Sequence, residues 1–531
     1  MKLPRFTWWL VGIHVTLTAV LALANPHLHL LDDAYYSLTI ARNIATGDGI
    51  TYGGLPTNGF QPLYALAMAP VTALCGDRPE LVLRLAKLLL GLCSAGLLLI
   101  LMRLARELVD ETAAIVTGLL YVANANLFAH HLSGLETALH GLLFWLFVLL
   151  YLRRRESDRP ATLIGLGLLL GLTAYARFDT VFLFFAVAAD QFWRYRRQPR
   201  TAMLRGAALF LPAGIMLAPW FIWSRIACGS FLQSSGAFHR WRGLVQQDIP
   251  ASAAGAVKFA AAKLIALGVK LPLEPLTGYE RPMRGLAAAL LGRERMRTGF
   301  LLQLLQEKPV ATAALAGLGL GLAALVFWAG RRHLHRVLAL RPLAFLLLAL
   351  GGASLFYPLY LLNYSMRHFF VYSVGLMLVW GALLSGFASA SWLRDKRARY
   401  AALAALAVLP ALPGIFAWTT DHTPVAAWEL VTTIEKHVPP GEKIGYTDCG
   451  VFGYYLTGHT VVNLDGILNF AALHAMRDGD IGAYLTTHRV PYVLYLHNFQ
   501  ADFADQWRRY IAPRAAPLPE VDWIYRLPDR Q

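Results

Sequence analysis

The sequence predicts an α-helical, multi-span membrane protein that ends in a small extracytoplasmic α/β domain. Its 531 residues are 57% hydrophobic, and their mean hydropathy of +0.47 lies far above the soluble globular norm. A bilayer core needs about 20 apolar residues for each spanning helix. Composition therefore excludes a soluble globular protein, and the apolar runs define a helical bundle.

About eleven segments satisfy the length criterion for a spanning helix. They lie near residues 7–24, 82–102, 113–131, 138–152, 161–176, 180–193, 206–224, 310–329, 342–361, 369–388 and 400–418. The segment 62–75 is apolar but short, and it contains Pro70. We expect an interfacial or re-entrant helix there.

Arginine and lysine clusters set the orientation of the predicted bundle. With these spans, every cluster falls on the side of the N-terminus: Lys2/Arg5, Arg103/Arg106, Arg153–Arg155, Arg194/Arg196/Arg197/Arg200, Arg331/Arg332/Arg336 and Arg394/Lys396/Arg397/Arg399. The positive-inside rule then places the N-terminus in the cytoplasm and the C-terminal end outside the inner membrane. Most of the +16 formal charge is explained in this way, so we expect the lipid bilayer as a partner and no nucleic acid.

Two outer segments, 25–81 and 225–309, are too long to be simple connections. We expect residues 1–419 to form the membrane module and residues 420–531 a periplasmic α/β domain. In the second outer segment, the amphipathic stretches 253–268 and 285–305 fit helices at the membrane interface or loop helices packed on the bundle. In the terminal domain, the pattern predicts a helix at 425–437 and strands at 443–446, 460–463 and 492–496.

The most informative motif is the acidic pair Asp32-Asp33, which follows the first span and opens a predicted helix ending at Gly47-Asp48-Gly49. Carboxylates near a membrane surface are costly unless they are solvated, paired or functional. The positive end of the helix favours an ionised carboxylate, and an ionised Asp can act as a general base. The alternative is that Asp32 only caps the helix.

Other polar residues gather near the predicted outer ends of helices. They are His130, His131 and Glu136; Arg177 and Asp179; Arg225; His239 and Arg240; and Arg367 and His368. Arginine suits phosphate oxygens because its planar fork donates hydrogen bonds in pairs. Single members also fit snorkelling side chains, and Arg177 with Asp179 fits a local ion pair. The two histidines with Glu136 fix no metal geometry, so we commit to no metal or other cofactor.

Several motifs in the first 240 residues resemble the GT-C glycosyltransferases, and most of all the branch of protein O-mannosyltransferases and lipid A aminoarabinose transferases. They are Asp32-Asp33-Ala34-Tyr35-Tyr36, Ala41 to Gly49, Pro56-Thr57-Asn58-Gly59-Phe60-Gln61-Pro62-Leu63, Gly134-Leu135-Glu136-Thr137-Ala138 and Pro219-Trp220. The later residues resemble this family only in architecture. One departure concerns the donor pocket: the aminoarabinose branch has Lys-Pro-Pro where this chain has Phe60-Gln61-Pro62, so the phosphate needs another cation.

The resemblance implies an inverting transferase that takes a sugar from a polyprenyl-phosphate donor and passes it to an acceptor in the cell envelope. Asp32 is then the catalytic base and Asp33 its assistant. The cations expected at the donor phosphate are Arg225, Arg240, Arg367 and His368. The side chains expected to contact sugar or acceptor are Glu136, His131, Tyr36 and Gln61.

Two other classes compete with this interpretation. A transporter or flippase for a lipid-linked glycan predicts polar residues deep in several spans and broken helices near the midplane. A scaffold that only displays the terminal domain gives no reason for the paired acids. In that domain, residues 446–450 and 463–466 fit acceptor contacts or ordinary strand-to-turn connections.

Overall fold

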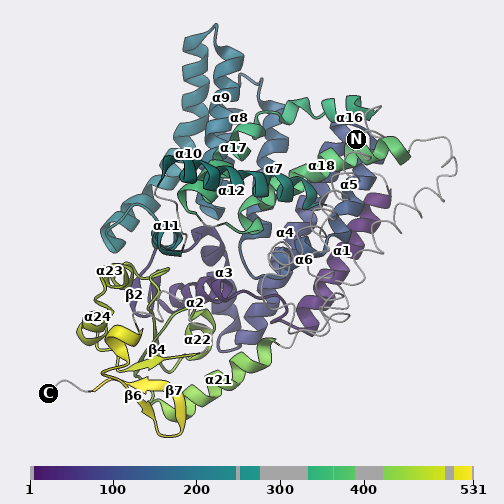
Figure 1. Ribbon diagram of the computed structural model, residues 1–531. Coiled ribbons are helices and arrows are strands. Elements are labelled where there is room, and N and C mark those ends of the chain that lie inside the picture. Colours follow the sequence, from purple (N-terminus) through teal and green to yellow (C-terminus); the bar gives the residue numbers. More distant parts are fainter. Residues whose placement is uncertain are drawn as a thin grey trace.

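Helices form most of the part of the chain that the structure describes (Figure 1). The computed structural model describes residues 5–246, 252–275, 333–362, 364–388, 423–496 and 507–528. The bundle helices are α1 (Arg5–Ala24), α4 (Pro79–Leu108), α5 (Glu111–Ala123), α6 (Ala125–Leu132), α7 (Thr137–Arg154), α8 (Pro160–Ala176), α9 (Val181–Tyr195), α10 (Pro199–Cys228), α16 (Leu334–Leu338), α17 (Leu346–Leu355) and α18 (Phe370–Ala388).

Within the described residues, five helices are long and apolar enough to cross a membrane, or six if the bent pair α5–α6 is one span. Helices α8, α9 and α17 lie where spans were predicted but are shorter, at 17, 15 and 10 residues. The predicted spans 310–329 and 400–418 lie outside the described residues. The fold class is therefore confirmed as a multi-span helical protein, with fewer clear spans than the eleven that hydropathy predicts.

The predicted span 113–131 is not continuous, because the chain bends by 64° between α5 and α6. Asn124 lies at the break, and its side chain accepts a hydrogen bond of 3.0 Å from the N–H of Leu127. Asparagine is a favoured N-cap because it satisfies a free donor at a helix start. A new helix therefore begins inside an apolar run that hydropathy alone treats as one span.

The first outer segment folds over the bundle as two helices joined by a small ribbon. Helix α2 (Asp32–Thr46) ends at Gly47, whose φ of 93° is the left-handed conformation typical of a glycine C-cap. Strands β1 (Thr51–Tyr52) and β2 (Leu55–Pro56) pair antiparallel. The short apolar helix α3 (Pro62–Cys75) follows, as the sequence predicts.

The second outer segment contributes α11 (Ser234–Gln246) and α12 (Ala253–Leu273). The indole N–H of Trp380 in α18 donates a hydrogen bond of 2.7 Å to the carbonyl of Pro272 near the end of α12. This contact favours a helix packed on the bundle over one that lies free at the interface. The predicted helix at 285–305 lies outside the described residues.

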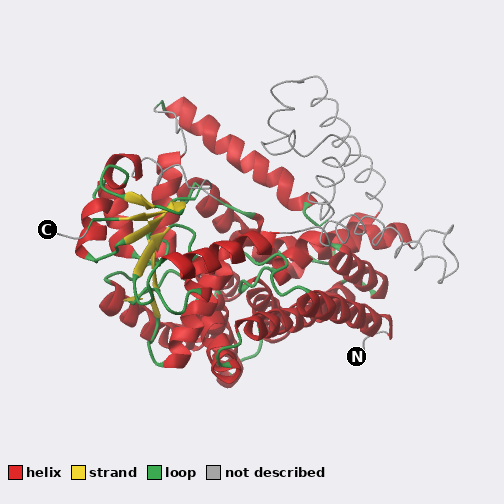
Figure 2. Ribbon diagram, turned by 90° about the horizontal axis from the view of Figure 1, so that it is seen from below, coloured by secondary structure: helices red, strands yellow, loops and turns green. Residues whose placement is uncertain are grey.

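The terminal domain is a five-stranded sheet flanked by short helices (Figure 2). The strand order is β4-β3-β5-β7-β6, with β3, β4 and β5 parallel and β6 and β7 antiparallel. Its elements are α21 (Thr423–His437), β3 (Lys443–Tyr446), α22 (Gly450–Tyr455), β4 (Thr460–Asn463), α23 (Phe470–Asp478), α24 (Ile481–Thr487), β5 (Tyr492–Leu494), β6 (Ala516–Leu518) and β7 (Val521–Arg526). The three predicted strands and the predicted helix are confirmed, whereas β6, β7 and the other helices were missed.

One hydrophobic core joins the terminal domain to the first outer segment. Tyr36, Ile40 and Tyr52 from the start of the chain are buried together with Ile444 and Phe452 from the domain. Segments about 400 residues apart therefore share buried apolar surface, which is the main favourable term in such an association. The domain is docked on α2 and the ribbon, and it does not hang free on a linker.

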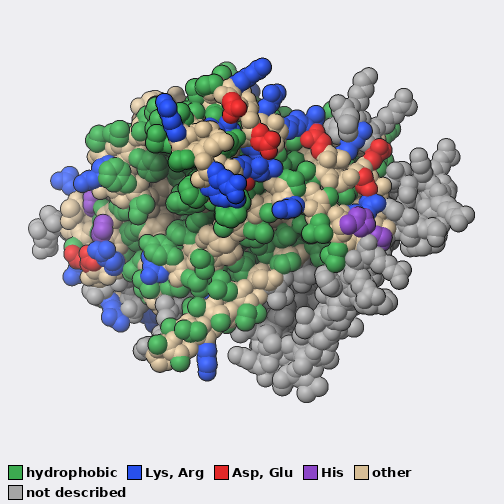
Figure 3. Space-filling model, turned by 90° about the horizontal axis from the view of Figure 1, so that it is seen from above, with side chains coloured by type: hydrophobic (Ala, Val, Ile, Leu, Met, Phe, Trp, Pro, Cys, Tyr) green, Lys and Arg blue, Asp and Glu red, His purple; other side chains and the backbone are tan. Residues whose placement is uncertain are grey.

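The N-terminus and the connection between α9 and α10 lie at one end of the molecule, opposite the terminal domain (Figure 1). Seen from that end, Lys and Arg side chains gather over part of the surface (Figure 3). Several of them form ion pairs there, among them Arg194 with Asp190 at 2.9 Å and Arg205 with Asp158 at 2.7 Å. The described basic clusters thus share one end with the N-terminus, which is the arrangement the sequence predicts.

Candidate active site

Asp32 opens α2 and binds the backbone of the terminal domain. Its carboxylate accepts hydrogen bonds from the N–H groups of Gly450 (2.8 Å) and Val451 (2.9 Å), at the start of α22. The N-cap position of α2 is Leu31, and it makes no side-chain cap. Asp32 therefore does not cap its own helix, which rules out the simplest structural explanation for this residue.

The ionisation of Asp32 differs from what the sequence suggests. Burial raises the pKa of this carboxyl group to about 8, against the two backbone hydrogen bonds, which lower it. The negative charges of Asp33 and Asp448 raise it further. The direction of this shift is opposite to the one expected from the helix start, because desolvation outweighs the two backbone hydrogen bonds.

The chain around Cys449 is held by two tyrosines of the first outer segment. The hydroxyl of Tyr36 accepts from the N–H of Cys449 at 2.8 Å, and the hydroxyl of Tyr52 donates to its carbonyl at 2.7 Å. Arg42 donates to the carbonyls of Gly453 and Tyr454 at 2.9 and 2.6 Å. Tyr36 is thus buried in the domain interface, where its hydroxyl is engaged with protein backbone and not with a sugar.

Asp33 forms the second half of the site. Its carboxylate accepts from Arg367 at 2.7 Å, and the two side chains keep 33% and 22% of their exposure. Arg367 lies on the turn Met366–Phe369 before α18, so the pair joins the start of the chain to the last described bundle helix. A partly open ion pair of this kind keeps a cation and a carboxylate available to a ligand.

His239 of α11 lies close to this ion pair. Its Nδ1 atom is buried and has no hydrogen-bond partner within the described residues. Burial lowers the pKa of His239 to about 4, and the charge of Arg367 lowers it further while Asp33 opposes this. The imidazole is therefore neutral at physiological pH, and it adds a polar group beside Asp33 without adding charge.

Arg177 organises a separate, more deeply buried cluster. It donates to Glu136 at 2.7 Å and to Asp179 at 3.0 Å, and the Tyr357 hydroxyl donates to Asp179 at 2.5 Å. Burial alone raises the pKa of Asp179, but the Arg177 charge outweighs it and the net direction is down. The local pair of Arg177 with Asp179 is confirmed. Glu136, expected at the sugar or acceptor, is instead buried in this network.

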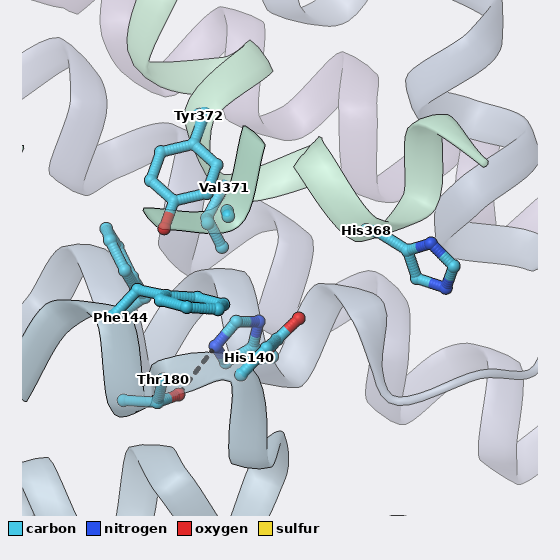
Figure 4. A pocket seen from close by; sticks show the side chains of 9 residues that line it. His140, Phe144, Thr180, His368, Val371 and Tyr372 are labelled. Carbon is cyan, nitrogen blue, oxygen red and sulfur yellow. Dashed lines mark hydrogen bonds between the residues drawn. The ribbon is translucent and has the colours of Figure 1, made fainter. Parts of the chain in front are cut away.

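A small pocket lies beside the Arg177 cluster (Figure 4). His140 and Phe144 of α7 line it on one side and Tyr372 of α18 on the other. His140 and Thr180 are hydrogen-bonded at 3.0 Å. Asp179 and His368 also line the pocket, so it borders the Arg177 cluster.

The four cations expected at the donor phosphate separate into two groups. Arg367 pairs with Asp33, and His368 stacks on Tyr357 with ring centroids 4.3 Å apart. In contrast, Arg240 donates to the Tyr360 carbonyl and covers its ring. Arg225 is exposed and donates to the Gly229 carbonyl at the end of its own helix. Of these four residues, Arg367 is the one that the described contacts place on the acidic pair, whereas His368 lies against Tyr357 of the Arg177 cluster.

His131 and Gln61 were both expected at the sugar or acceptor. His131 is fully buried, and its Nδ1 atom lies 2.8 Å from the Ser94 hydroxyl inside the bundle. His14 of α1 contacts the same hydroxyl at 2.7 Å, so His131 belongs to a polar network that joins helices. The Gln61 side chain accepts a long hydrogen bond of 3.4 Å from the N–H of Phe178. Gln61 therefore lies next to the Arg177 cluster.

A metal site is not assembled from the described residues, because they hold no group of three or more His, Cys, Asp or Glu side chains that fits an ion. Sequence reasoning missed the peptide groups of Gly450 and Val451, and it missed Tyr357. Backbone donors leave no signal in side-chain identity. The nearest indication was the strand-to-turn pattern at 446–450, which was left open between an acceptor contact and an ordinary connection.

Comparison with known proteins adds two family matches. Residues 59–223 match the model of the dolichyl-phosphate-mannose-protein mannosyltransferase family. Residues 417–524 match a domain of unknown function. No curated protein matches the sequence.

Solved structures of an oligosaccharyltransferase from Archaeoglobus fulgidus share the fold. Its crystal structure with zinc and sulfate has a TM-score of 0.54 at 12% identity, covering 98% of this chain and 73% of that chain. The archaeal enzyme AglB with an inhibitory peptide and a dolichol-phosphate has a TM-score of 0.51 at 13% identity, covering 92% and 69%. ArnT from Cupriavidus metallidurans aligns over 99% of this chain and 98% of its own, at 16% identity and a TM-score of 0.43.

The helical bundle, which carries an acidic pair and an arginine at one end, shares its fold with the archaeal oligosaccharyltransferase. Over residues 59–223 the chain is similar to the dolichyl-phosphate-mannose-protein mannosyltransferase family.

Proposed function

We propose that this protein is an inverting glycosyltransferase of the outer face of the inner membrane, and that its acceptor is a lipid, glycan or protein of the cell envelope. The acidic pair lies at the end of the molecule that carries the docked domain, opposite the basic end with the N-terminus (Figure 1). Under the positive-inside rule, this end faces away from the cytoplasm.

The observation that carries the proposal is the ion pair of Arg367 with Asp33, the residue that follows Asp32 in the sequence. The cation and the acids are more than 330 positions apart in the sequence, yet Arg367 and Asp33 lie 2.7 Å from each other. Transfer from a polyprenyl phosphate needs a base for the acceptor and positive charge for the leaving phosphate. Asp32 is the base and Arg367 the cation that we assign to these requirements, and the family match of residues 59–223 supports a polyprenyl-phosphate donor for the protein.

The proposed reaction is a single displacement. Asp32 takes the proton from an acceptor hydroxyl, the acceptor oxygen bonds to the anomeric carbon, and the bond from that carbon to the phosphate oxygen breaks. The electron pair leaves with the polyprenyl phosphate, whose negative charge Arg367 stabilises, with His368 beside it. Asp33 holds Arg367 in place until the donor binds. One displacement inverts the anomeric centre.

The test uses purified protein, a panel of polyprenyl-phosphate sugars that includes mannose and aminoarabinose, and an envelope extract as acceptor. Mass spectrometry follows the release of polyprenyl phosphate, and NMR assigns the anomeric configuration of the product. We expect release with one donor and an inverted product. A retained configuration contradicts the single displacement. Absence of release with every donor, together with movement of the lipid-linked sugar across vesicles, supports a flippase instead.

A further inference from the structure

The terminal domain matches only a domain of unknown function, yet its contacts with α2 are specific. Gly450 lies so close to α2 that a Cβ atom there would come within 2.1 Å of the Asp32 carbonyl oxygen. A Cβ atom on Gly453 would come within 2.1 Å of the Tyr52 hydroxyl. Such approaches are far below van der Waals contact, so only glycine permits this fit.

Within this fit, the carboxylate of Asp32 receives two hydrogen bonds from consecutive peptide groups, at 2.8 and 2.9 Å. These N–H groups belong to the first turn of α22, where no carbonyl within the helix is available to them. Hydrogen bonds to a charged group are stronger than those between neutral groups. The two donors therefore fix the direction of the carboxylate and favour its ionised form.

We infer that the terminal domain is a working part of the catalytic site: the N–H groups of Gly450 and Val451 position Asp32 and keep it competent to accept a proton. This inference rests on the proposed function, since it gives a role to the base of that reaction. The two residues are positioning residues, because they act through Asp32 and need not touch the substrate.

Other groups also act on Asp32 and set the background for a pH measurement. Asp33 of α2 and Asp448 of the β3–α22 connection raise the pKa of Asp32 by charge repulsion. The remaining titratable groups that interact with it electrostatically are Tyr35, Tyr36, Tyr52, Tyr446 and Cys449. The substitution at Val451 leaves all of these side chains in place. It therefore tests the one hydrogen bond from the Val451 N–H to the Asp32 carboxylate.

The experiment compares Val451→Pro with Val451→Ala in the full-length protein. Proline removes the N–H that Asp32 uses and costs no hydrogen bond within α22, since proline is tolerated in the first turn of a helix. Alanine keeps the N–H and removes the side chain. The measurement is the pH profile of kcat for release of polyprenyl phosphate, together with alkylation of the buried Cys449 as a report of domain docking.

We expect Val451→Pro to move the rising limb of the profile to higher pH and to lower kcat at pH 7 by about tenfold, given the strength of a charged hydrogen bond. Val451→Ala keeps the wild-type profile, and Cys449 stays unreactive in both variants. If proline undocks the domain, an ester at the 451 amide, introduced as α-hydroxyisovaleric acid, removes the N–H alone and is expected to give the same shift.

Identical pH profiles for the docked proline or ester variant and for Val451→Ala overturn the inference. Failure of the proposed function looks different. In that case the wild type releases no polyprenyl phosphate, or Asp32→Asn releases it as fast as the wild type, and the state of the Val451 amide is then irrelevant.

Discussion

Two arginine–carboxylate clusters lie at the same end of this bundle, and they differ mainly in burial. Arg177 and Glu136 keep only 8% and 6% of their side-chain exposure, and Asp179 and Tyr357 complete their hydrogen bonds. Arg367 and Asp33 keep 22% and 33%, and the neighbouring His239 has a buried nitrogen without a partner in the described part of the chain. The same residue types thus form a closed structural network in one place and an open site in the other.

The comparison shows that residue type and position near a helix end do not distinguish a structural ion pair from one that can bind a ligand. A buried, fully bonded ion pair has no capacity for a ligand, and breaking it leaves an uncompensated charge. In a partly exposed pair, the arginine can release its carboxylate partner and bind a phosphate instead. The predictions below test this difference, beginning with the largest effect.

Removing the centre of the closed cluster is expected to affect folding most. Arg177→Ala leaves Glu136 and Asp179 buried without their cation, a loss of about 3–5 kcal/mol for a broken buried pair. We expect little folded protein after membrane extraction, as measured by size-exclusion chromatography and thermal unfolding. A variant that folds normally and loses only activity would place Arg177 in the reaction and remove the distinction between the clusters.

Removing the cation of the open cluster is expected to affect the reaction instead. Arg367→Ala is expected to lower kcat by about 10²-fold or more, because one charge-stabilising donor at a leaving group has that effect. The melting temperature should stay within a few degrees of the wild type, and Arg367→Lys should recover part of the rate. Full activity of Arg367→Ala would show that another cation neutralises the phosphate.

The pH dependence of the reaction follows from the raised pKa of Asp32. A base must be ionised, so with a pKa of about 8 the rate should rise about tenfold per pH unit below that value and level off above it. Asp448→Asn removes one repelling charge and keeps a residue that tolerates the positive φ of 46° at this position. Its rising limb should therefore move to lower pH by less than one unit. If the rate of this variant rises at the same pH as in the wild type, or at a higher pH, the assignment of Asp448 as a repelling charge is contradicted.

The smallest effects are expected at the two arginines that the structure places elsewhere. Arg225→Ala removes an exposed contact with a helix end, and the donor KM and kcat should stay within about twofold of the wild type, as for most surface substitutions. A large rise in donor KM would restore the original assignment of Arg225 to the phosphate. Arg240 makes a cation–π contact with Tyr360, so Arg240→Ala should alter stability more than KM.

The sequence was sufficient for features that depend on regular patterns. Apolar runs predicted the bundle, short β-type runs predicted β3, β4 and β5, and the glycine at 47 predicted the end of α2. The break at Asn124 was missed because one polar residue hardly changes the hydropathy of an apolar segment. The strands β6 and β7 were missed because neither has a clear apolar pattern, and β6 pairs only with β7 at the edge of the sheet.

Within the site, the acidic pair and Arg367 were found because charged residues near a membrane are rare and need an explanation. Tyr36, His131 and Glu136 were assigned to ligand contacts that the structure gives to protein partners. Whether such a side chain contacts a ligand or another part of the protein depends on partners that are distant in sequence. The partner of Glu136 is 41 positions away and that of Tyr36 is 413 positions away. Neither distance is visible in a local pattern.

The central claim is that Asp32 is the catalytic base, and a paired comparison of Asp32→Asn with Asp48→Asn tests it most directly. Asp48 lies just beyond the other end of α2, and its carboxylate accepts a hydrogen bond from the nearby Thr46 hydroxyl, so it serves as a matched acid outside the site. Both variants are assayed at pH 8 for release of polyprenyl phosphate with the donor that the wild type uses. The account predicts wild-type release by Asp48→Asn and a loss of about 10²-fold or more by folded Asp32→Asn. Equal release by the two variants would contradict it.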